Sequence, residues 1–315
     1  MIAVLGAGAF GTALAVTLAA NGPVRLWARD ASSLLRDRVS PRLPGIHLPD
    51  AVCPTGDLDE LDGHDLLLAV PMQQLRSLLP RLSDLHVPHA VAACKGIDLQ
   101  TLQTPADLIA DALPDTVPAL LSGPSFAADI ARGLPTALTL ACAYDAAGAR
   151  LQAALSTPTL RLYRSTDMTG VALGGALKNV VAIACGAAIG AGLGESARAA
   201  LMTRGMAEMM RLSTALGARP ETLMGLSGLG DLALTCASPQ SRNFALGLAL
   251  GRGDPPPDAT TEGVATARAA LRLGARHGID LPVTQATAGL VDGTLTVETA
   301  IQSLLARDLT TETPP

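Results

Sequence analysis

The sequence predicts an α/β protein with a doubly wound, largely parallel sheet in its N-terminal half and helices alone in its C-terminal half. Short apolar runs alternate with helical patterns up to about residue 166, as in sheets covered by helices on both faces. Strand patterns then fade, and only helical periodicity remains. The length of 315 residues fits two domains, which we expect over 1–166 and 167–315.

Each predicted element follows from its local pattern. A strand at 2–5 leads through a glycine-rich turn into a helix at about 11–20, which ends at an Asn-Gly pair. The further predicted strands are 24–27, 66–70, 90–93, 119–121, 136–142 and 160–163. The helices expected between them include 72–79, 102–112, 126–132 and 146–155. The helices expected after residue 166 are 168–190, 195–216, 221–225, 241–251, 262–277, 284–291 and 297–306. In the second of these, Glu208 follows Arg204 by four residues, which allows a surface ion pair.

Composition excludes several classes of protein. Apolar residues make up 49% and charged residues 16% of the chain, which excludes a disordered protein. A net charge of −5 without a basic block argues against nucleic acid as a partner. The uncharged stretches 2–24 and 179–194 are interrupted by glycines or too short for a membrane span, so we expect both to be buried segments. With no targeting signal, the expected location is the cytoplasm.

Cysteine and histidine are scattered along the chain. There are five of each, and no close pair has the spacing of a zinc site or a disulfide framework. We therefore expect no metal site and interpret the cysteines as small apolar residues.

A glycine-rich loop follows the first predicted strand. Gly6, Gly8 and Gly11 form a G-x-G-x-x-G pattern that opens an Ala-rich helix, the context in which this pattern binds dinucleotides. Gly6 permits the turn, Gly8 lets the backbone approach a pyrophosphate, and Gly11 allows close packing of helix on strand. The sequence therefore predicts a Rossmann-like domain that binds NAD or NADP.

The end of the second predicted strand bears on the choice between these cofactors. Arg29 and Asp30 stand there together. An acid favours the free ribose 2′-hydroxyl of NAD, whereas an arginine accommodates the 2′-phosphate of NADP. Because Arg29 comes first, the sequence favours NADPH or dual use, although an exposed Arg-Asp turn without a ligand is the alternative.

The chain has only two lysines, Lys95 and Lys178, against 21 arginines. Unlike arginine, lysine can be tuned to exchange a proton. Lys178 lies among small and apolar residues, so it is either a buried proton donor or a lysine whose head reaches solvent at a helix edge. Asp231, in a glycine-rich turn, would orient a lysine or a substrate hydroxyl, or else be a turn aspartate or the N-cap of a helix.

Two further motifs indicate anion binding. Ser125, in Ser122–Ala127, follows a predicted strand and could cap the next helix at an anion site. Arg242, flanked by Ser241 and Asn243, combines a guanidinium fork, a hydroxyl and an amide, the groups that bind a phosphate. A solvated helix start is the alternative for this second group.

Taken in order, these motifs resemble the NAD(P)-dependent sn-glycerol-3-phosphate dehydrogenases of bacteria. The resemblance covers nearly the whole chain. It rests on the segments 6–11, 94–98, 122–127, 174–179, 194–209, 228–236, 240–243 and 261–263. This family interconverts dihydroxyacetone phosphate and glycerol 3-phosphate, generally for phospholipid synthesis, and a homodimer is typical of it.

The resemblance also implies residue roles. Lys178 would exchange a proton at the C2 oxygen, with Lys95 and Asp231 setting its field and orientation. The substrate-binding set would be Lys95, Gly123, Ser125, Lys178, Asp231, Ser241, Arg242 and Asn243. The cofactor-binding set would be Gly6, Gly8, Ala9, Phe10, Gly11, Arg29, Lys95, Ala127, Arg242, Thr260 and Glu262. Ala9 departs from a serine common in the family, and the proline-rich segment 255–257 comes just before Thr260.

Two other functions compete with this interpretation. A related β-hydroxy acid dehydrogenase would share the two-domain plan and a catalytic lysine, but Arg242 and its neighbours favour a phosphorylated substrate. A non-catalytic NAD(P)-sensing module would need the glycine loop but not Lys178 and Asp231 together with a phosphate site.

Overall fold

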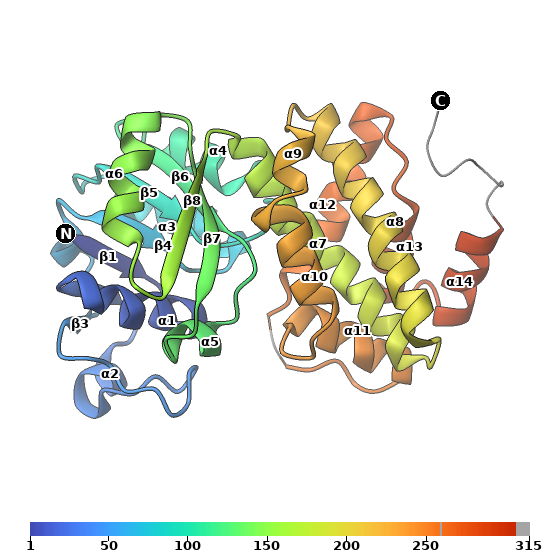
Figure 1. Cartoon of the computed structure of the whole chain (residues 1–315), viewed down its shortest axis with the longest axis horizontal. Helices are drawn as coiled ribbons and strands as arrows, with labels where there is room; N and C mark the ends of the chain where they lie inside the picture. The colour runs from blue at the N-terminus through green and yellow to red at the C-terminus, as the bar shows by residue number, and fades with distance from the viewer. Residues whose placement is uncertain (259, 307–315) are drawn as a thin grey trace.

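A computed structural model of the chain describes residues 1–258 and 260–306. One sheet is followed by helices alone, so the predicted fold class is confirmed (Figure 1). The strands are β1 (Ile2–Leu5), β2 (Val24–Trp27), β3 (Val52–Thr55), β4 (Asp65–Leu68), β5 (His89–Ala92), β6 (Val117–Ser122), β7 (Thr136–Cys142) and β8 (Leu160–Ser165). The helices among them are α1 (Ala9–Leu18), α2 (Ser32–Asp37), α3 (Met72–Leu78), α4 (Pro105–Ala112), α5 (Ala127–Ala131) and α6 (Asp145–Leu155).

The eight strands lie in the order β3-β2-β1-β4-β5-β6-β7-β8, and every neighbouring pair is parallel except β6 and β7. The first six strands follow the 3-2-1-4-5-6 order of dinucleotide-binding sheets. The order reverses between β1 and β4, where such sheets open a crevice at their carboxyl edge. Sequence patterns missed β3, whose Pro54 is tolerated because this strand lies at the sheet edge.

Alternating side chains of the strands form two apolar layers. In β1, Val4 packs on one face, in a core cluster that includes Leu14 of α1 and Leu151 of α6. Its neighbours Ala3 and Leu5 point to the opposite face, where α3 and α4 contribute the cluster. This period-two alternation places helices on both faces, as the sequence predicts.

The C-terminal part packs around one central helix (Figure 1). Its helices are α7 (Met168–Gly190), α8 (Gly194–Ala215), α9 (Pro220–Leu223), α10 (Asp231–Cys236), α11 (Arg242–Arg252), α12 (Glu262–His277), α13 (Pro282–Val291) and α14 (Val297–Leu305). By length and composition α7 could cross a membrane, but 94% of its most apolar window is buried inside the structure. Its hydrophobicity is therefore that of a core helix. The expected domain end at 315 falls in 307–315, outside the described residues.

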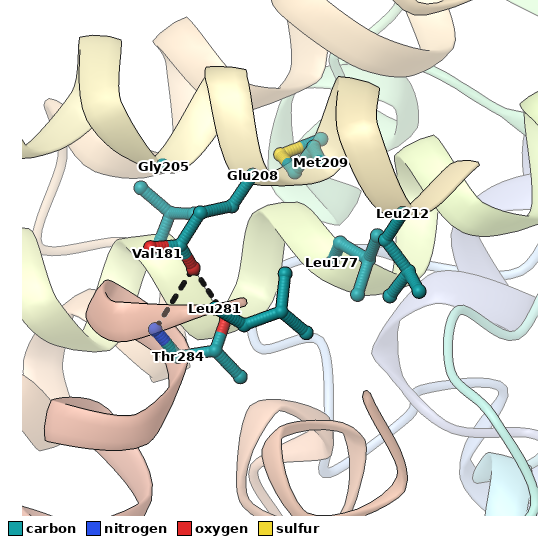
Figure 2. A pocket seen from close by; sticks show the side chains of 8 residues that line it. All are labelled: Leu177, Val181, Gly205, Glu208, Met209, Leu212, Leu281 and Thr284. Carbon is teal, nitrogen blue, oxygen red and sulfur yellow. Dashed lines mark hydrogen bonds between the residues drawn. The ribbon is translucent and has the colours of Figure 1, made fainter. Parts of the chain in front are cut away.

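Glu208 is buried, so the prediction of a surface ion pair with Arg204 was wrong. Its carboxylate accepts hydrogen bonds from the backbone N–H groups of Val283 (2.5 Å) and Thr284 (3.0 Å) and from the Thr284 hydroxyl (2.9 Å). Figure 2 shows this carboxylate reaching from α8 to the start of α13 beside a cavity of about 10 Å³, room for about one water. Glu208 thus caps the positive end of α13 from another helix, and burial raises its pKa.

Candidate active site

Four loops meet at the carboxyl edge of the sheet because the strands they follow are parallel. They lead from β1 into the glycine loop, from β4 into α3, from β5 to Lys95, and from β6 to Gly123. Gly6 and Ala69 show how closely two of these loops approach, since a Cβ on Gly6 would lie 2.7 Å from the Ala69 carbonyl oxygen. This edge is the ligand-binding side of doubly wound sheets.

The glycine loop has the shape that a dinucleotide requires. Gly6 has a φ of 110°, and a Cβ on Gly11 would lie 1.9 Å from the Gly6 carbonyl oxygen, so only glycine fits either position. A Cβ on Gly8 would meet nothing within 4 Å, and no side chain caps α1 at Gly8. The first N–H groups of α1 therefore lack intrahelical partners and face an open approach. These residues fit the pyrophosphate of NAD or NADP.

Three charged side chains from distant parts of the chain form one ionic cluster. Asp231, at the start of α10, lies between the two lysines: its Oδ1 is 3.0 Å from Lys178 Nζ and its Oδ2 is 2.5 Å from Lys95 Nζ. Lys178 also donates to the Thr235 hydroxyl at 2.6 Å, and Lys95 to the Gly123 carbonyl at 2.9 Å. Only 7% of Lys178 is exposed, so its head does not reach out to solvent.

Small residues in α7 allow this cluster to form. A Cβ on Gly175 would lie 2.5 Å from the Ser122 hydroxyl oxygen at the end of β6. A Cβ on Gly174 would lie 2.7 Å from the Ser227 carbonyl oxygen, in the short π-helix Leu226–Gly230 that precedes α10. The two glycines therefore let α7 approach the sheet edge and α10 together, which brings Lys178 to Asp231.

The cluster is tuned by burial and mutual charge. Burial lowers the pKa of Lys178 to about 8, with Asp231 opposing the shift and Lys95 adding to it. Burial alone would raise the pKa of Asp231, but the ammonium groups of Lys178 and Lys95 outweigh it and hold that pKa below its usual value. Lys178 can therefore exchange a proton near neutral pH, beside a carboxylate that stays ionised.

The start of α11 lies beside this cluster. Asn243 donates to the Asn179 side-chain oxygen at 2.9 Å and accepts from the Gly263 N–H at 2.9 Å, so it ties α11 to α7 and α12. Ser241 caps α11 by accepting from the Phe244 N–H. The exposed Arg242 forms no hydrogen bond to a described residue. The guanidinium and the first N–H groups of α11 are thus available to an anion.

The residues expected to bind the cofactor lie at several separate places in the structure. Ala9, Phe10 and Ala127 share one small apolar cluster at the starts of α1 and α5. Glu262 begins α12 and accepts from the Met72 N–H at 3.0 Å, and burial raises its pKa against the effects of this bond and of Arg242. Arg29 is exposed at the end of β2. Thr260 is exposed just before α12, next to residue 259, which lies outside the described residues.

Ser125 does not cap a helix. Phe126 is the N-cap of α5, and the Ser125 hydroxyl donates instead to the Gly123 carbonyl at 3.2 Å. Ser125 thereby shares this carbonyl with Lys95. Within the part of the chain that the structure describes, no group of three or more His, Cys, Asp or Glu side chains is placed to hold a metal ion.

Sequence reasoning gave no role to two polar residues of the site. Thr235 contacts both Lys178 and Asp231, with its hydroxyl 3.3 Å from Asp231 Oδ1. Had α10 been predicted, the four-residue spacing from Asp231 would have placed Thr235 on the same helix face. Asn179 links α7 to α11 through Asn243, and only the packing of the two helices reveals it.

The chain matches known proteins over nearly its whole length. Residues 1–148 match the family model of the NAD-dependent glycerol-3-phosphate dehydrogenase N-terminus, and 167–302 match that of its C-terminus. Glycerol-3-phosphate dehydrogenases (NAD(P)+) of Cereibacter sphaeroides and Paracoccus denitrificans are 59% and 58% identical. These matches cover 99% of this chain and 100% and 99% of the relatives.

A solved structure gives the same result. The crystal structure of glycerol-3-phosphate dehydrogenase from Coxiella burnetii is 37% identical, with a TM-score of 0.92 over 97% of this chain and 98% of that one. The chain belongs to the NAD-dependent glycerol-3-phosphate dehydrogenase family.

Proposed function

We propose that this chain interconverts dihydroxyacetone phosphate and sn-glycerol 3-phosphate with NAD(P)H, and so supplies glycerol 3-phosphate for glycerophospholipid synthesis. One observation carries the proposal: Lys178 is buried and forms an ion pair with Asp231. This pair lies at the same edge of the sheet as the glycine loop. The relatives' names supply the substrate and the cofactor class. A dinucleotide sensor has no use for such a tuned lysine.

Lys178 is the proposed proton donor at the C2 oxygen. When bound, the reduced nicotinamide supplies the hydride to C2. The Lys178 ammonium donates to the ketone oxygen and gives up its proton as negative charge develops there. Asp231 and Thr235 fix the direction of Nζ, and Lys95 adds positive charge near the same oxygen. A pKa of about 8 lets Lys178 regain its proton from solvent.

The start of α11 is the proposed phosphate site. Arg242 supplies a fork of donors, Ser241 a hydroxyl, and the first turn of α11 its positive end. Gly123 and Ser125 close the substrate site from the sheet side, next to Lys95. The Asn243 side-chain amide already donates to Asn179 and accepts from Gly263. Its proposed role is therefore mainly to hold this site in place. Because these groups suit a phosphate, an unphosphorylated β-hydroxy acid is the less favoured substrate.

The proposed cofactor site runs along the sheet edge. Its pyrophosphate position lies at Gly6, Gly8 and Gly11, with the remaining contacts from Ala9, Phe10, Ala127, Thr260, Glu262, Lys95 and Arg242. Arg29 is proposed to bind the 2′-phosphate of NADP, because its guanidinium forms no hydrogen bond or ion pair with another described residue. Asp30 accepts from the Ser32 N–H, which lowers its pKa and engages the acid that NAD would need.

The wider setting is also proposed. We assign 1–166 to cofactor binding and 167–315 to substrate binding, and we place the enzyme in the cytoplasm as a homodimer. The burial of the apolar helix α7 inside the structure supports the location, and the family resemblance supports the dimer. Light scattering of the purified protein tests the oligomeric state.

Initial rates test the function. The purified protein is mixed with dihydroxyacetone phosphate and either NADPH or NADH, and nicotinamide absorbance is followed. We expect turnover with both cofactors and a faster rate with NADPH. Turnover only with a short unphosphorylated β-keto acid would support the β-hydroxy acid dehydrogenase, and cofactor binding without turnover of either substrate would support the sensor.

A further inference from the structure

Residues 94–99, the segment that carries Lys95, follow β5 and lie outside the sheet. The N–H of Ala93 donates to the Leu68 carbonyl at 3.0 Å, and the next main-chain bond starts at Asp98, whose N–H donates to the Gln103 carbonyl at 2.9 Å. Between them, no main-chain hydrogen bond holds residues 94–97 to the rest of the described backbone. The backbone of Lys95 is therefore fixed by contacts of another kind.

One side-chain amide supplies much of this fixation. Gln73, on α3, donates from Nε2 to the Ile97 carbonyl at 2.8 Å and accepts at Oε1 from the Leu99 N–H at 3.0 Å. The amide thus pairs with two alternate residues of the segment, as a neighbouring strand would. Gly96 lies against the same helix, because a Cβ there would be 3.0 Å from the Met72 side chain. The segment is consequently pressed onto the start of α3.

The helical part of the chain holds the opposite side of the segment. Ile97 is buried in the apolar cluster that includes Leu173 and Leu177 of α7, and Arg272 of α12 donates to the Leu99 carbonyl. The segment therefore lies between α3 and the helices that carry Lys178. From this position Lys95 reaches Asp231.

We propose that Gln73 is a positioning residue for Lys95, holding the 94–99 segment so that the Lys95 ammonium stays on Asp231 and the Gly123 carbonyl. Gln73 acts through the backbone of the segment and touches no group of the Lys95–Asp231–Lys178 cluster. The inference deepens the proposed function, on which its kinetic consequence rests. Its structural consequence, the place of the Lys95 ammonium, does not depend on the substrate.

A displaced Lys95 changes the charge around Lys178. The groups that face Lys178 are Asp231, Thr235 and Cys236 of α10, and Lys95 from the sheet side. When Lys95 moves away, Lys178 loses a repelling charge and gains a larger share of the Asp231 carboxylate. Both changes favour the ammonium form, so the pKa of Lys178 rises.

The composition of the chain makes this measurable without any ligand. Because Lys95 and Lys178 are the only lysines, lysine-selective ¹³C labelling gives two side-chain NMR signals that can be titrated with pH. The test variant is Gln73→Met, which keeps the length and helix propensity of the side chain without its hydrogen bonds. The matched control is Gln100→Met, since the Gln100 side chain is exposed on the same loop and has no hydrogen bond to a described residue.

In Gln73→Met we expect a moved or broadened Lys95 signal and a Lys178 titration midpoint raised by roughly half a unit or more. The kcat/KM for dihydroxyacetone phosphate should fall roughly tenfold, with the midpoint of its pH profile moving the same way. Gln100→Met should match the wild type in the Lys95 signal, the Lys178 titration midpoint and the kcat/KM.

Unchanged lysine signals in a folded Gln73→Met protein would overturn the proposal, as would a loss of rate that leaves both pH midpoints in place. Arg272→Met, which removes the bond from the other side, should shift the same signals by a smaller amount. If the wild type fails to reduce dihydroxyacetone phosphate, the proposed function is wrong, yet the two lysine signals still decide the role of Gln73.

Discussion

The two sides of the candidate site are built from different materials. On the sheet side, Gly6 and Gly11 allow close packing of the backbone and Gly8 leaves open space, all within six residues of sequence. On the helical side, Asp231 pairs with Lys178 and also with Lys95 of the sheet side, from which it is separated by 136 residues of sequence. The sheet side therefore depends on the absence of side chains, whereas the helical side depends on their charge and burial. We therefore expect added side chains to disturb the sheet side and lost or altered charges to disturb the helical side.

The largest effect is expected at Lys178. Lys178→Arg keeps the positive charge but not a proton that leaves near neutral pH, so kcat should fall roughly 10²–10⁴-fold. Affinity for NADPH, measured by fluorescence titration, should stay within about twofold of the wild type because the glycine loop is untouched. A variant with near-wild-type turnover would remove the proton-transfer role from Lys178.

The next largest effect is expected on stability at Asp231. Asp231→Asn leaves two ammonium groups facing each other without their shared carboxylate, and breaking a buried ion pair costs about 3–5 kcal/mol. Urea unfolding should show this loss at neutral pH. Asp30→Asn is the exposed control, since its carboxylate bonds only to the adjacent turn, and it should be near wild type. Equal stabilities for the two variants would mean that the ionic cluster contributes little to folding.

This contrast also explains what the sequence could predict. The glycine loop could be predicted because its sequence signals are local: a strand, three glycines and the start of a helix. Lys95 and Lys178 stood out against the arginine-rich composition, but their meeting at Asp231 required the packing of α7 on α10. Thr235 was missed because no helix was predicted over the residues that form α10. Glu208 was misread because only its tertiary contacts show that α13 needs a cap.

Titration of Lys178 gives the third prediction. Its pKa is 10.5 in the unfolded chain and about 8 in the folded protein, so between these pH values the unfolded state binds the extra proton. Stability therefore rises with pH across this window. The full difference is about 3 kcal/mol. Lys178→Met lacks this group, so the free energy of unfolding of the wild type minus that of the variant should rise from pH 8 to 10.5. A flat difference would show that folding leaves the lysine pKa unchanged.

A pair of glycine substitutions probes the sheet side. Gly11→Ala places a methyl group against the Gly6 carbonyl and should cost about 1–3 kcal/mol of stability, as overpacking does. Gly8→Ala meets nothing in the protein, so thermal unfolding without ligand should be near wild type while NADPH binding weakens. If Gly8→Ala bound NADPH as tightly as the wild type, the pyrophosphate would not lie at this backbone.

The smallest effect is expected at Arg29, where a side chain acts on the otherwise backbone-built sheet side. Arg29→Ser removes a charge-assisted contact to the 2′-phosphate, a group that NADH lacks. The ratio of kcat/KM for NADPH to that for NADH should therefore fall roughly tenfold, as expected for one hydrogen bond to a charged group, with the NADH value nearly unchanged. Arg42→Ser, at another exposed arginine whose side chain has no hydrogen bond to a described residue, is the control for a general loss of positive charge. If both variants lower the ratio equally, the preference arises from the overall field of the surface, and Arg29 does not read the phosphate directly.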